Sequence, residues 1–174
     1  MAQYPPGIRA AQAIGLTGAA WLAGNIAGYS LVSIPSLLKS HADHQAPLPL
    51  IVKQWRDMYE VGKFQNPPIA VITAAAFSYL AWSVDKRVGV AALAPRNAVA
   101  LYSVAAALTV GIVPWTLAAM KGTNGRLLEK AGSVWIVDEE RSEEVKGLLG
   151  RWTVLNAIRG LFPLVGAVVG VYAF

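Results

Sequence analysis

The last stretch of the chain, from Trp152 to Phe174, is a membrane-length apolar segment that contains a charged residue. Its strongly polar side chains are Asn156 and Arg159, which follow Trp152 by four and seven residues. On a helix these positions share one stripe, which continues to Pro163. A guanidinium inside such a segment costs about 3 kcal/mol or more unless it is paired or reaches the interface. The stripe therefore indicates either a structural pairing of Arg159 or an internal pocket in which it binds an anionic group.

Three further stretches are long enough to cross a bilayer, which requires roughly 17–25 apolar residues. Residues 10–38, 67–84 and 97–120 carry no charge, and the C-terminal segment is the fourth candidate span. The whole chain is 55% apolar and only 14% charged, which is unusual for a soluble domain. We therefore predict an all-α integral membrane four-helix bundle, folded as a single domain over residues 1–174.

The expected helices cover residues 8–38, 50–84, 96–121 and 143–173. An amphipathic extension over residues 50–64 precedes the apolar part of the second helix. We expect this helix to break near Asn66, because the residue before a proline is pushed out of the α region and Pro67 and Pro68 follow. Such a break at the membrane edge would open the mouth of a cavity.

A short internal repeat relates the two halves of the chain. Ile34-Pro35 near the end of the first helix corresponds to Val113-Pro114 in the third. The second and fourth helices carry Trp55-x3-Tyr59-x2-Gly62 and Trp152-x3-Asn156-x2-Arg159. Repeat interfaces are frequent binding sites in membrane proteins. The pattern predicts two similar helical hairpins with both tryptophan stripes turned toward a common centre.

The net charge of +5 comes from basic residues in the short connections between apolar segments. Basic residues beside membrane helices contact lipid headgroups, so this charge does not indicate nucleic acid binding. The connections over residues 39–66 and 121–151 are the more basic, which favours a cytosolic position for both. The absence of cysteine excludes disulfides and thiolate metal sites.

Two histidines, His41 and His44, flank Asp43 in the first connection and are the only metal-ligating imidazoles of the chain. Spacing of this kind could supply part of a metal site. No third ligand is evident nearby in the sequence, so solvated loop histidines are the better interpretation. In the first helix, Asn25 and Tyr29 lie one turn apart, and they indicate either hydrogen bonding between helices or the wall of a pocket.

Several short blocks of sequence follow one another along the chain. They are Gly28-Tyr29-Ser30, Trp55-Arg56-Asp57-Met58-Tyr59-Glu60, Ile112-Val113-Pro114-Trp115-Thr116, Thr123-Asn124, and Trp152-x-x-Leu155-Asn156-x-x-Arg159. Their order and spacing over nearly the whole chain resemble the fungal anthrone oxygenases. The chain departs from the pattern at Gly125, where a basic or polar residue is expected.

The resemblance implies a small integral membrane protein with four helices that oxidises a polyketide anthrone to an anthraquinone with O2. It also implies that the reaction uses no metal or flavin cofactor, and that the protein is a multi-pass protein of the endoplasmic reticulum or another endomembrane. Its partners would be a small aromatic polyketide and membrane lipids. The spacing Gly166-x3-Gly170 fits either a homo-oligomer contact or packing within the chain.

Anthrone oxidation of this kind would proceed through the substrate anion, the anthranolate, which can reduce O2. The protein must then supply a flat apolar cavity, a base and donors directed at the oxyanion. The side chains expected to hold the rings are Trp55, Trp152, Tyr29 and Tyr102, with Asn25 and Asn124 as further contacts. Arg159 and Asn156 are expected to donate to the oxyanion.

The expected base is Glu60 or Asp57, both beside Tyr59, with His41 or His44 as second candidates. Burial favours the neutral acid, which makes a carboxylate a better base. Two other functions remain open at this point. One is a metal-dependent oxidase that uses His41 and His44 with Asp43 or Glu60, and the other is a non-catalytic lipid-binding or accessory membrane protein.

Overall fold

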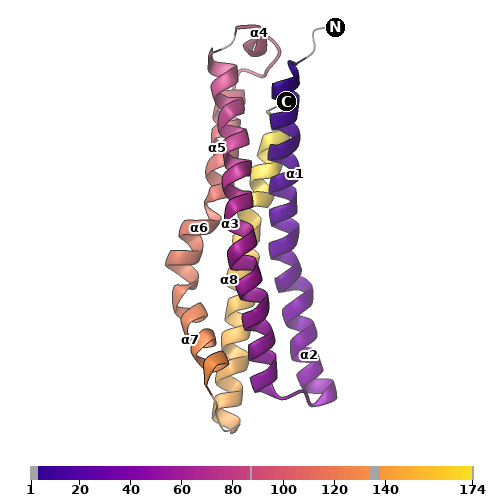
Figure 1. Ribbon diagram of the computed structural model, residues 1–174, viewed down its shortest axis with the longest axis vertical. Helices are drawn as coiled ribbons and strands as arrows, with labels where there is room; N and C mark the ends of the chain where they lie inside the picture. The colour runs from indigo at the N-terminus through magenta and orange to yellow at the C-terminus, as the bar shows by residue number, and fades with distance from the viewer. Residues whose placement is uncertain (1–3, 87, 134–137, 174) are drawn as a thin grey trace. The chain divides into compact units, whose positions relative to one another are not determined.

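The computed structural model describes residues 4–86, 88–133 and 138–173, and its secondary structure is helical (Figure 1). No strand occurs in these described ranges, so the all-α prediction is confirmed. The described residues form four long helical stretches, which cover residues 6–44, Leu48–Lys86, Ala98–Gly132 and Glu139–Val171. The short helix α4 (Val88–Ala91) lies between the second and third stretches.

The first stretch contains a widened turn. It begins as α1 (Pro6–Gly28), passes through the π-helical turn η1 (Tyr29–Ser33) and continues as α2 (Ile34–His44). The N–H of Ile34 donates to the carbonyl of Tyr29, five residues earlier, which closes the π turn. Pro35 follows at once and has no N–H to donate, so a regular α-helical ladder cannot continue through this position.

The second stretch is the single helix α3 (Leu48–Lys86), in which Pro67 and Pro68 are internal. The predicted break near Asn66 is therefore wrong. Proline removes backbone hydrogen bonds but fixes φ close to the helical value. On either side of the prolines, α3 is held by the fully buried rings of Trp55 and Phe77. This packing keeps the backbone helical through both prolines.

The third stretch comprises α5 (Ala98–Val110), α6 (Ile112–Trp115), the π-helical turn η2 (Thr116–Met120) and α7 (Lys121–Gly132). It is longer than predicted, because α7 continues the helix beyond residue 121. The last helix, α8 (Glu139–Val171), begins four residues earlier than expected. The N-terminal end of α8 lies beside α7 (Figure 1), where Glu144 pairs with Arg126 at 2.7 Å and Lys130 at 2.6 Å.

The chain forms two compact units, and each takes a segment from every long stretch. The first unit comprises Met1–Gly24, Asn66–Pro114 and Gly160–Phe174. The second unit comprises Asn25–Gln65 and Trp115–Arg159. The position at which a break was expected in α3 is the boundary between the units. The single-domain organisation stays a prediction.

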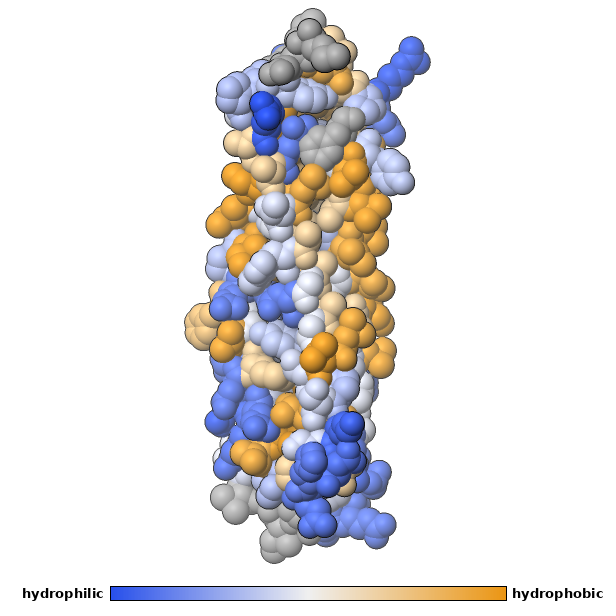
Figure 2. Space-filling model, turned by 90° about the vertical axis from the view of Figure 1, so that its right-hand side faces the viewer, coloured by the Kyte–Doolittle hydropathy of each residue, from blue (hydrophilic) through white to orange (hydrophobic). Residues whose placement is uncertain are grey.

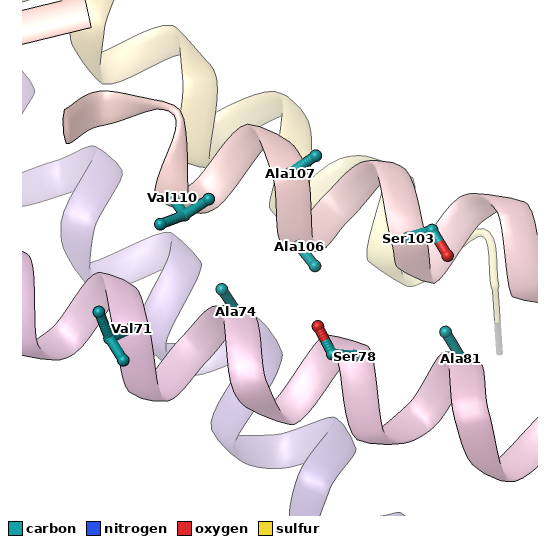
Figure 3. Close-up of a pocket in the computed structure, with 8 residues that line it drawn as sticks. All are labelled: Val71, Ala74, Ser78, Ala81, Ser103, Ala106, Ala107 and Val110. Atoms are coloured by element: carbon teal, nitrogen blue, oxygen red, sulfur yellow. The ribbon is translucent and has the colours of Figure 1, made fainter. Parts of the chain in front are cut away.

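The core of the first unit is built on close approach of helices around Phe77, whose ring lies 6.4 Å from that of Tyr102. A Cβ added to Gly15 or to Gly170 would come within 2.8 Å of the Phe77 ring. Small residues on α3 and α5, among them Ala74 and Ala106, also line an open pocket of about 460 Å³ between these two helices (Figure 3).

The core of the second unit contains Trp55 and Trp152, surrounded by aliphatic residues of α3, α7 and α8. Trp55 is fully buried and Trp152 almost so. Burial of such large rings contributes more to stability than burial of any aliphatic residue in this core. This core therefore fixes the part of α8 that carries Asn156 and Arg159.

Among the described residues, three helical stretches are long and apolar enough to cross a membrane, namely Leu48–Lys86, Ala98–Gly132 and Glu139–Val171. The first helical stretch, expected as a fourth span, does not belong to this set. Large apolar side chains such as Leu31 (73% exposed) and Phe64 (74% exposed) lie on the outer surface. Figure 2 shows such apolar side chains on one face, as expected of a surface in contact with lipid.

Candidate functional site

The centre of the second unit is a cluster of three aromatic rings. Trp55 stacks on Tyr59 one turn further along α3, with ring centroids 5.3 Å apart and an interplanar angle of 18°. The ring of Trp152 on α8 meets Trp55 edge-on, at 5.8 Å and 88°. The sequence repeat predicted that the two tryptophan stripes would meet, and the structure brings them into contact.

The Trp152 ring is held in place by a side chain of α7. Its Nε1 donates a hydrogen bond to Oδ1 of Asn124 at 3.0 Å. Both residues are buried, so the hydrogen bond satisfies an indole donor that would otherwise be costly to bury. Asn124 therefore fixes the orientation of Trp152 and, through it, the edge that faces Trp55.

Asn156 is fully buried one turn after Trp152, and its amide nitrogen is saturated with acceptors. Nδ2 donates to the carbonyl of Ile26 at 2.9 Å and to Oγ of Ser30 at 2.8 Å. A carbonyl can only accept, so the contact with Ile26 fixes which end of the amide is the nitrogen. Asn156 therefore presents Oδ1, an acceptor, in place of the donor that the sequence led us to expect.

Arg159 lies three residues after Asn156, and its guanidinium is largely enclosed. Nη1 donates to Oγ1 of Thr116 at 3.2 Å. The side chains of Tyr59 and Tyr29 lie within electrostatic range of the guanidinium. No carboxylate pairs with Arg159 within the described part of the chain. The sequence suggested that Arg159 could be paired for structural reasons. The pairing in the structure is a weak one, with the neutral hydroxyl of Thr116.

Both π-helical turns contribute a partner to this part of α8. η1 supplies Ser30 to Asn156, and η2 supplies Thr116 to Arg159. Single π turns inside α-helices are often found at functional sites, because the extra residue turns side chains out of the regular register. Each turn adjoins a proline, Pro35 in the first case and Pro114 in the second.

The contacts between α3 and α8 show how the site extends. Trp55 meets Trp152, and Tyr59, one turn later on α3, lies within electrostatic range of Arg159 on α8. The two helices therefore advance in the same direction within the second unit. From Trp152 to Arg159 the stripe extends about 10 Å along α8, since each residue rises by about 1.5 Å. An aromatic end and a cationic end thus lie on one continuous face.

Three buried polar atoms of this unit have no hydrogen-bond partner among the described residues. They are Nε1 of Trp55, Oδ1 of Asn156 and Nε of Arg159. Such orphaned groups are uncommon in folded proteins, because each loses its hydration without replacement. Two donors and one acceptor on neighbouring side chains are the complement of a polar, flat ligand.

The two carboxylates predicted as bases lie at the periphery. Asp57 is 73% exposed and lies 3.6 Å from Arg56. Glu60 pairs with Lys63 at 3.3 Å, and the Lys63 ammonium lies over the Tyr59 ring at 5.9 Å. Glu60 is thus connected to the aromatic cluster through a neighbouring cation.

The histidines do not assemble a metal site with neighbouring side chains. Nδ1 of His41 lies 2.7 Å from the carbonyl of Ala46, and His44 is exposed. Within residues 4–86, 88–133 and 138–173 there is no group of three or more His, Cys, Asp or Glu side chains that could hold a metal ion. The exposed position of His44 agrees with its interpretation as a solvated loop residue.

The remaining predicted contacts divide between the units. Asn25 and Tyr29 are half-buried in the second unit, near the π turn η1. Tyr102 lies in the core of the first unit, where its hydroxyl accepts a hydrogen bond from Gln12 Nε2 at 3.4 Å. The structure therefore does not bring Tyr102 into the same unit as Trp55.

The sequence pattern did not single out the partners of Asn156 and Arg159 as site residues. Ser30 precedes Pro35 by five residues and Thr116 follows Pro114 by two, and these two prolines were the available signal. Trp115 also serves this site, because its Nε1 donates to the carbonyl of Leu155 at 3.1 Å. That bond ties the end of α6 to α8 next to Asn156.

Helices of membrane-spanning length, a buried tryptophan pair and a guanidinium that pairs with no carboxylate of the described residues define a small helical membrane protein with a candidate site for an anion. The anthrone oxygenase family model matches residues 55–169. The chain belongs to the anthrone oxygenase family, as the sequence blocks suggested. The matched range includes Trp55, Trp152, Asn156 and Arg159.

Several curated fungal proteins are similar over most of their length. Anthrone oxygenase encC of Aspergillus fumigatus is 39% identical, over 92% of this chain and 90% of that protein. Anthrone oxygenase AgnL2 of Paecilomyces divaricatus is 33% identical over 92% of both chains. Noranthrone monooxygenase of Aspergillus flavus is 35% identical, over 89% of this chain and 68% of that protein. No solved structure matches the chain at a significant level.

Proposed function

We propose that this protein is a membrane oxygenase that oxidises a polyketide anthrone to the anthraquinone with O2. Membership of the anthrone oxygenase family and its similarity to fungal anthrone oxygenases and a noranthrone monooxygenase support this activity. The observation that carries the site assignment is the half-buried Arg159, whose Nε is buried and unpaired and which follows Trp152 of the Trp55–Tyr59–Trp152 cluster by two turns on α8. A cation without a carboxylate is suited to an anionic ligand.

The reaction converts the anthrone methylene and O2 into a carbonyl and water. Loss of one methylene proton gives the anthranolate, whose negative charge is shared with the oxygen of the carbonyl group on the opposite side of the central ring. The anthranolate passes one electron to O2, and the radical pair combines to form a carbon–oxygen bond. After protonation, the hydroperoxide loses water as the second carbon–hydrogen bond breaks, and the new carbonyl retains one oxygen atom of O2.

The aromatic cluster would hold the substrate rings. Trp55 and Trp152 meet edge-on, so a flat ligand can stack on one ring while its edge faces the other. Offset and edge-on aromatic contacts contribute about 1 kcal/mol each beyond burial. Tyr29 and Asn25 would complete the wall on the η1 side, and Asn124 contributes by orienting Trp152. Tyr102 is left out of this assignment because it belongs to the first unit.

Arg159 would bind the oxygen on which the anthranolate charge is concentrated. Donors fixed around a developing oxyanion stabilise it without reorganisation, and loss of one such donor typically lowers the rate by about 10²–10³. Thr116 holds one arm of the guanidinium by accepting from Nη1, which leaves Nε available. Asn156 contributes through Oδ1, an acceptor.

Tyr59 is the residue that we assign to the methylene proton. Its ring stacks on Trp55, and the Lys63 ammonium lies over its ring at 5.9 Å. Its oxygen is the polar atom that this aromatic cluster offers to accept a proton from a stacked substrate. Glu60 would receive the proton from this edge of the site, whereas exposed Asp57 lies further from the cluster.

The proposed chemistry needs no metal or flavin, because the anthranolate itself is the reductant of O2. The catalytic requirement is then to form this anion and to shield it from water. A membrane setting suits an apolar tricyclic substrate, which partitions into lipid before it reaches the site. We further propose that the protein resides in the endoplasmic reticulum or another endomembrane.

The function is tested with detergent-purified protein, an anthrone and isotopically labelled O2. The proposal predicts a rate of quinone formation above the uncatalysed oxidation, with one labelled oxygen atom in each quinone. Quinone that forms at the uncatalysed rate, or that carries oxygen from labelled water alone, would contradict it. Heat-denatured protein in the same detergent provides the background rate.

A further inference from the structure

The amide of Asn156 is held in one orientation by the backbone of the first helical stretch. Its nitrogen donates both hydrogens, one to Ile26 and one to Ser30. Its oxygen is buried and has no partner among the described residues. An acceptor fixed in this way cannot rotate toward another donor of the protein, so it is available to a donor that a ligand brings.

The position of this acceptor places it within the proposed substrate site. On α8, Asn156 lies between Trp152, one turn before it, and Arg159, three residues after it. Trp152 contacts Trp55, whose Nε1 is a second buried atom without a partner among the described residues. The amide oxygen of Asn156 thus belongs to the same stretch of α8 as the residues proposed to contact the rings and the oxyanion.

The ligand that satisfies these atoms must carry both acceptors and a donor. Its oxygens can accept from Arg159 Nε and Trp55 Nε1, and a hydroxyl group can donate to Asn156 Oδ1. In an anthrone, a hydroxyl adjacent to the ring carbonyl donates its hydrogen internally to that carbonyl. Only a hydroxyl on an outer ring position, away from the carbonyl, has its hydrogen free.

We infer that Asn156 is a specificity-determining residue whose Oδ1 accepts a hydrogen bond from a hydroxyl on an outer ring position of the substrate. The substrate class is then an anthrone with a hydroxyl that is not internally bonded to the carbonyl. This inference rests on the proposed function. Sites built to bond a substrate hydroxyl discriminate strongly against analogues that lack it, because a buried polar group is then left unpaired.

Binding of quinones tests the inference without interference from spontaneous oxidation. The probes are 2-hydroxyanthraquinone, whose hydroxyl is free, and 1-hydroxyanthraquinone, whose hydroxyl is internally bonded. A third probe, 2-methoxyanthraquinone, keeps the oxygen and cannot donate. Affinities are measured by quenching of tryptophan fluorescence at about pH 6, because the conjugated carbonyl makes the hydroxyl of 2-hydroxyanthraquinone more acidic than the phenol of tyrosine, whose pKa is about 10, and a low pH keeps it neutral.

We expect 2-hydroxyanthraquinone to bind about tenfold more tightly than either of the other two quinones, as one additional hydrogen bond to a buried acceptor would provide. The Asn156→Leu variant should lose this preference. The Ser30→Ala variant removes the other partner of the amide but keeps Oδ1, and it should retain the preference. Equal affinity of the unmutated protein for the three quinones overturns the inference, whether or not Asn156→Leu folds. A preference that survives in Asn156→Leu also overturns it.

Turnover separates the failure of this inference from the failure of the proposed function. If anthrones are oxidised and the three quinones bind alike, the specificity assignment alone is wrong. If the free-hydroxyl quinone is preferred and no anthrone is oxidised above background, the proposed reaction is wrong and Asn156 still recognises the hydroxyl. These two readouts use the same purified protein.

Discussion

The indole Nε1 of Trp152 donates a hydrogen bond to Oδ1 of Asn124, which precedes it by 28 residues and lies on a different helix. Both side chains are buried. The bond connects α7 to the aromatic cluster and sets the edge of Trp152 that meets Trp55. A residue without direct contact to the proposed substrate thus controls the geometry of a ring that stacks near it.

Replacement of Asn124 by leucine should destabilise the second unit and lower turnover. The change leaves the indole N–H of Trp152 buried without an acceptor, which costs about 1–3 kcal/mol. Thermal unfolding in detergent measures the loss. In a Trp152→Phe background the same replacement should cost much less, because phenylalanine has no N–H. Equal costs in both backgrounds would show that the hydrogen bond does not contribute.

Tyr59→Phe should lower turnover of an anthrone by about 10²-fold or more, as expected for loss of a general base. Glu60→Gln should have a smaller effect, because Glu60 is joined to the cluster only through Lys63. Asp57→Asn should have the smallest effect of the three, because Asp57 is exposed. Initial rates at saturating substrate rank the variants. A larger loss in Glu60→Gln than in Tyr59→Phe would assign the base to the carboxylate.

Gly15→Ala should destabilise the protein by about 1–3 kcal/mol through overpacking. The added Cβ would come within 2.8 Å of the Phe77 ring, and Gly170 approaches the same ring as closely, so the ring has no room to move. Gly24→Ala is the matched control on the same helix, because its Cβ would meet no atom within 4 Å. That variant should gain up to about 1 kcal/mol from helix propensity. Unfolding temperatures that shift in the same direction for both variants would contradict the packing account.

Chelator treatment should leave turnover unchanged if the substrate anion is the only reductant of O2. The measurement compares quinone formation before and after dialysis against a strong chelator, with elemental analysis of the active sample. Activity that disappears with a stoichiometric metal and returns when the metal is restored would favour the metal-dependent alternative. His41→Ala and His44→Ala variants would then identify the ligands.

The helical content and the face of α8 could be predicted because both are local properties of the sequence. Apolar runs of membrane length define helices without knowledge of their neighbours. The spacing of Trp152, Asn156 and Arg159 places them on one stripe by helical geometry alone. The repeat then paired this stripe with that of Trp55, and the two tryptophans are in contact.

The remaining features depend on packing between helices and could not be read from the sequence. Pro67 and Pro68 suggested a break, yet α3 continues because its flanks are held by buried rings. The π turns beside Pro35 and Pro114 turn Ser30 and Thr116 toward α8, which no local pattern reports. The donor role expected of Asn156 was wrong for the same reason, because the Ile26 carbonyl occupies its nitrogen.

Turnover of an anthrone by Arg159→Met, compared with Arg151→Met, tests the central assignment most directly. Both residues lie on α8, but Arg151 is exposed and Arg159 carries the buried Nε. We predict that Arg159→Met folds, as judged by its elution and unfolding temperature in detergent, and loses about 10²–10³ in turnover rate. Arg151→Met should retain the rate of the unmutated protein. A folded Arg159→Met variant with full turnover would contradict the assignment of Arg159 as the residue that holds the substrate anion.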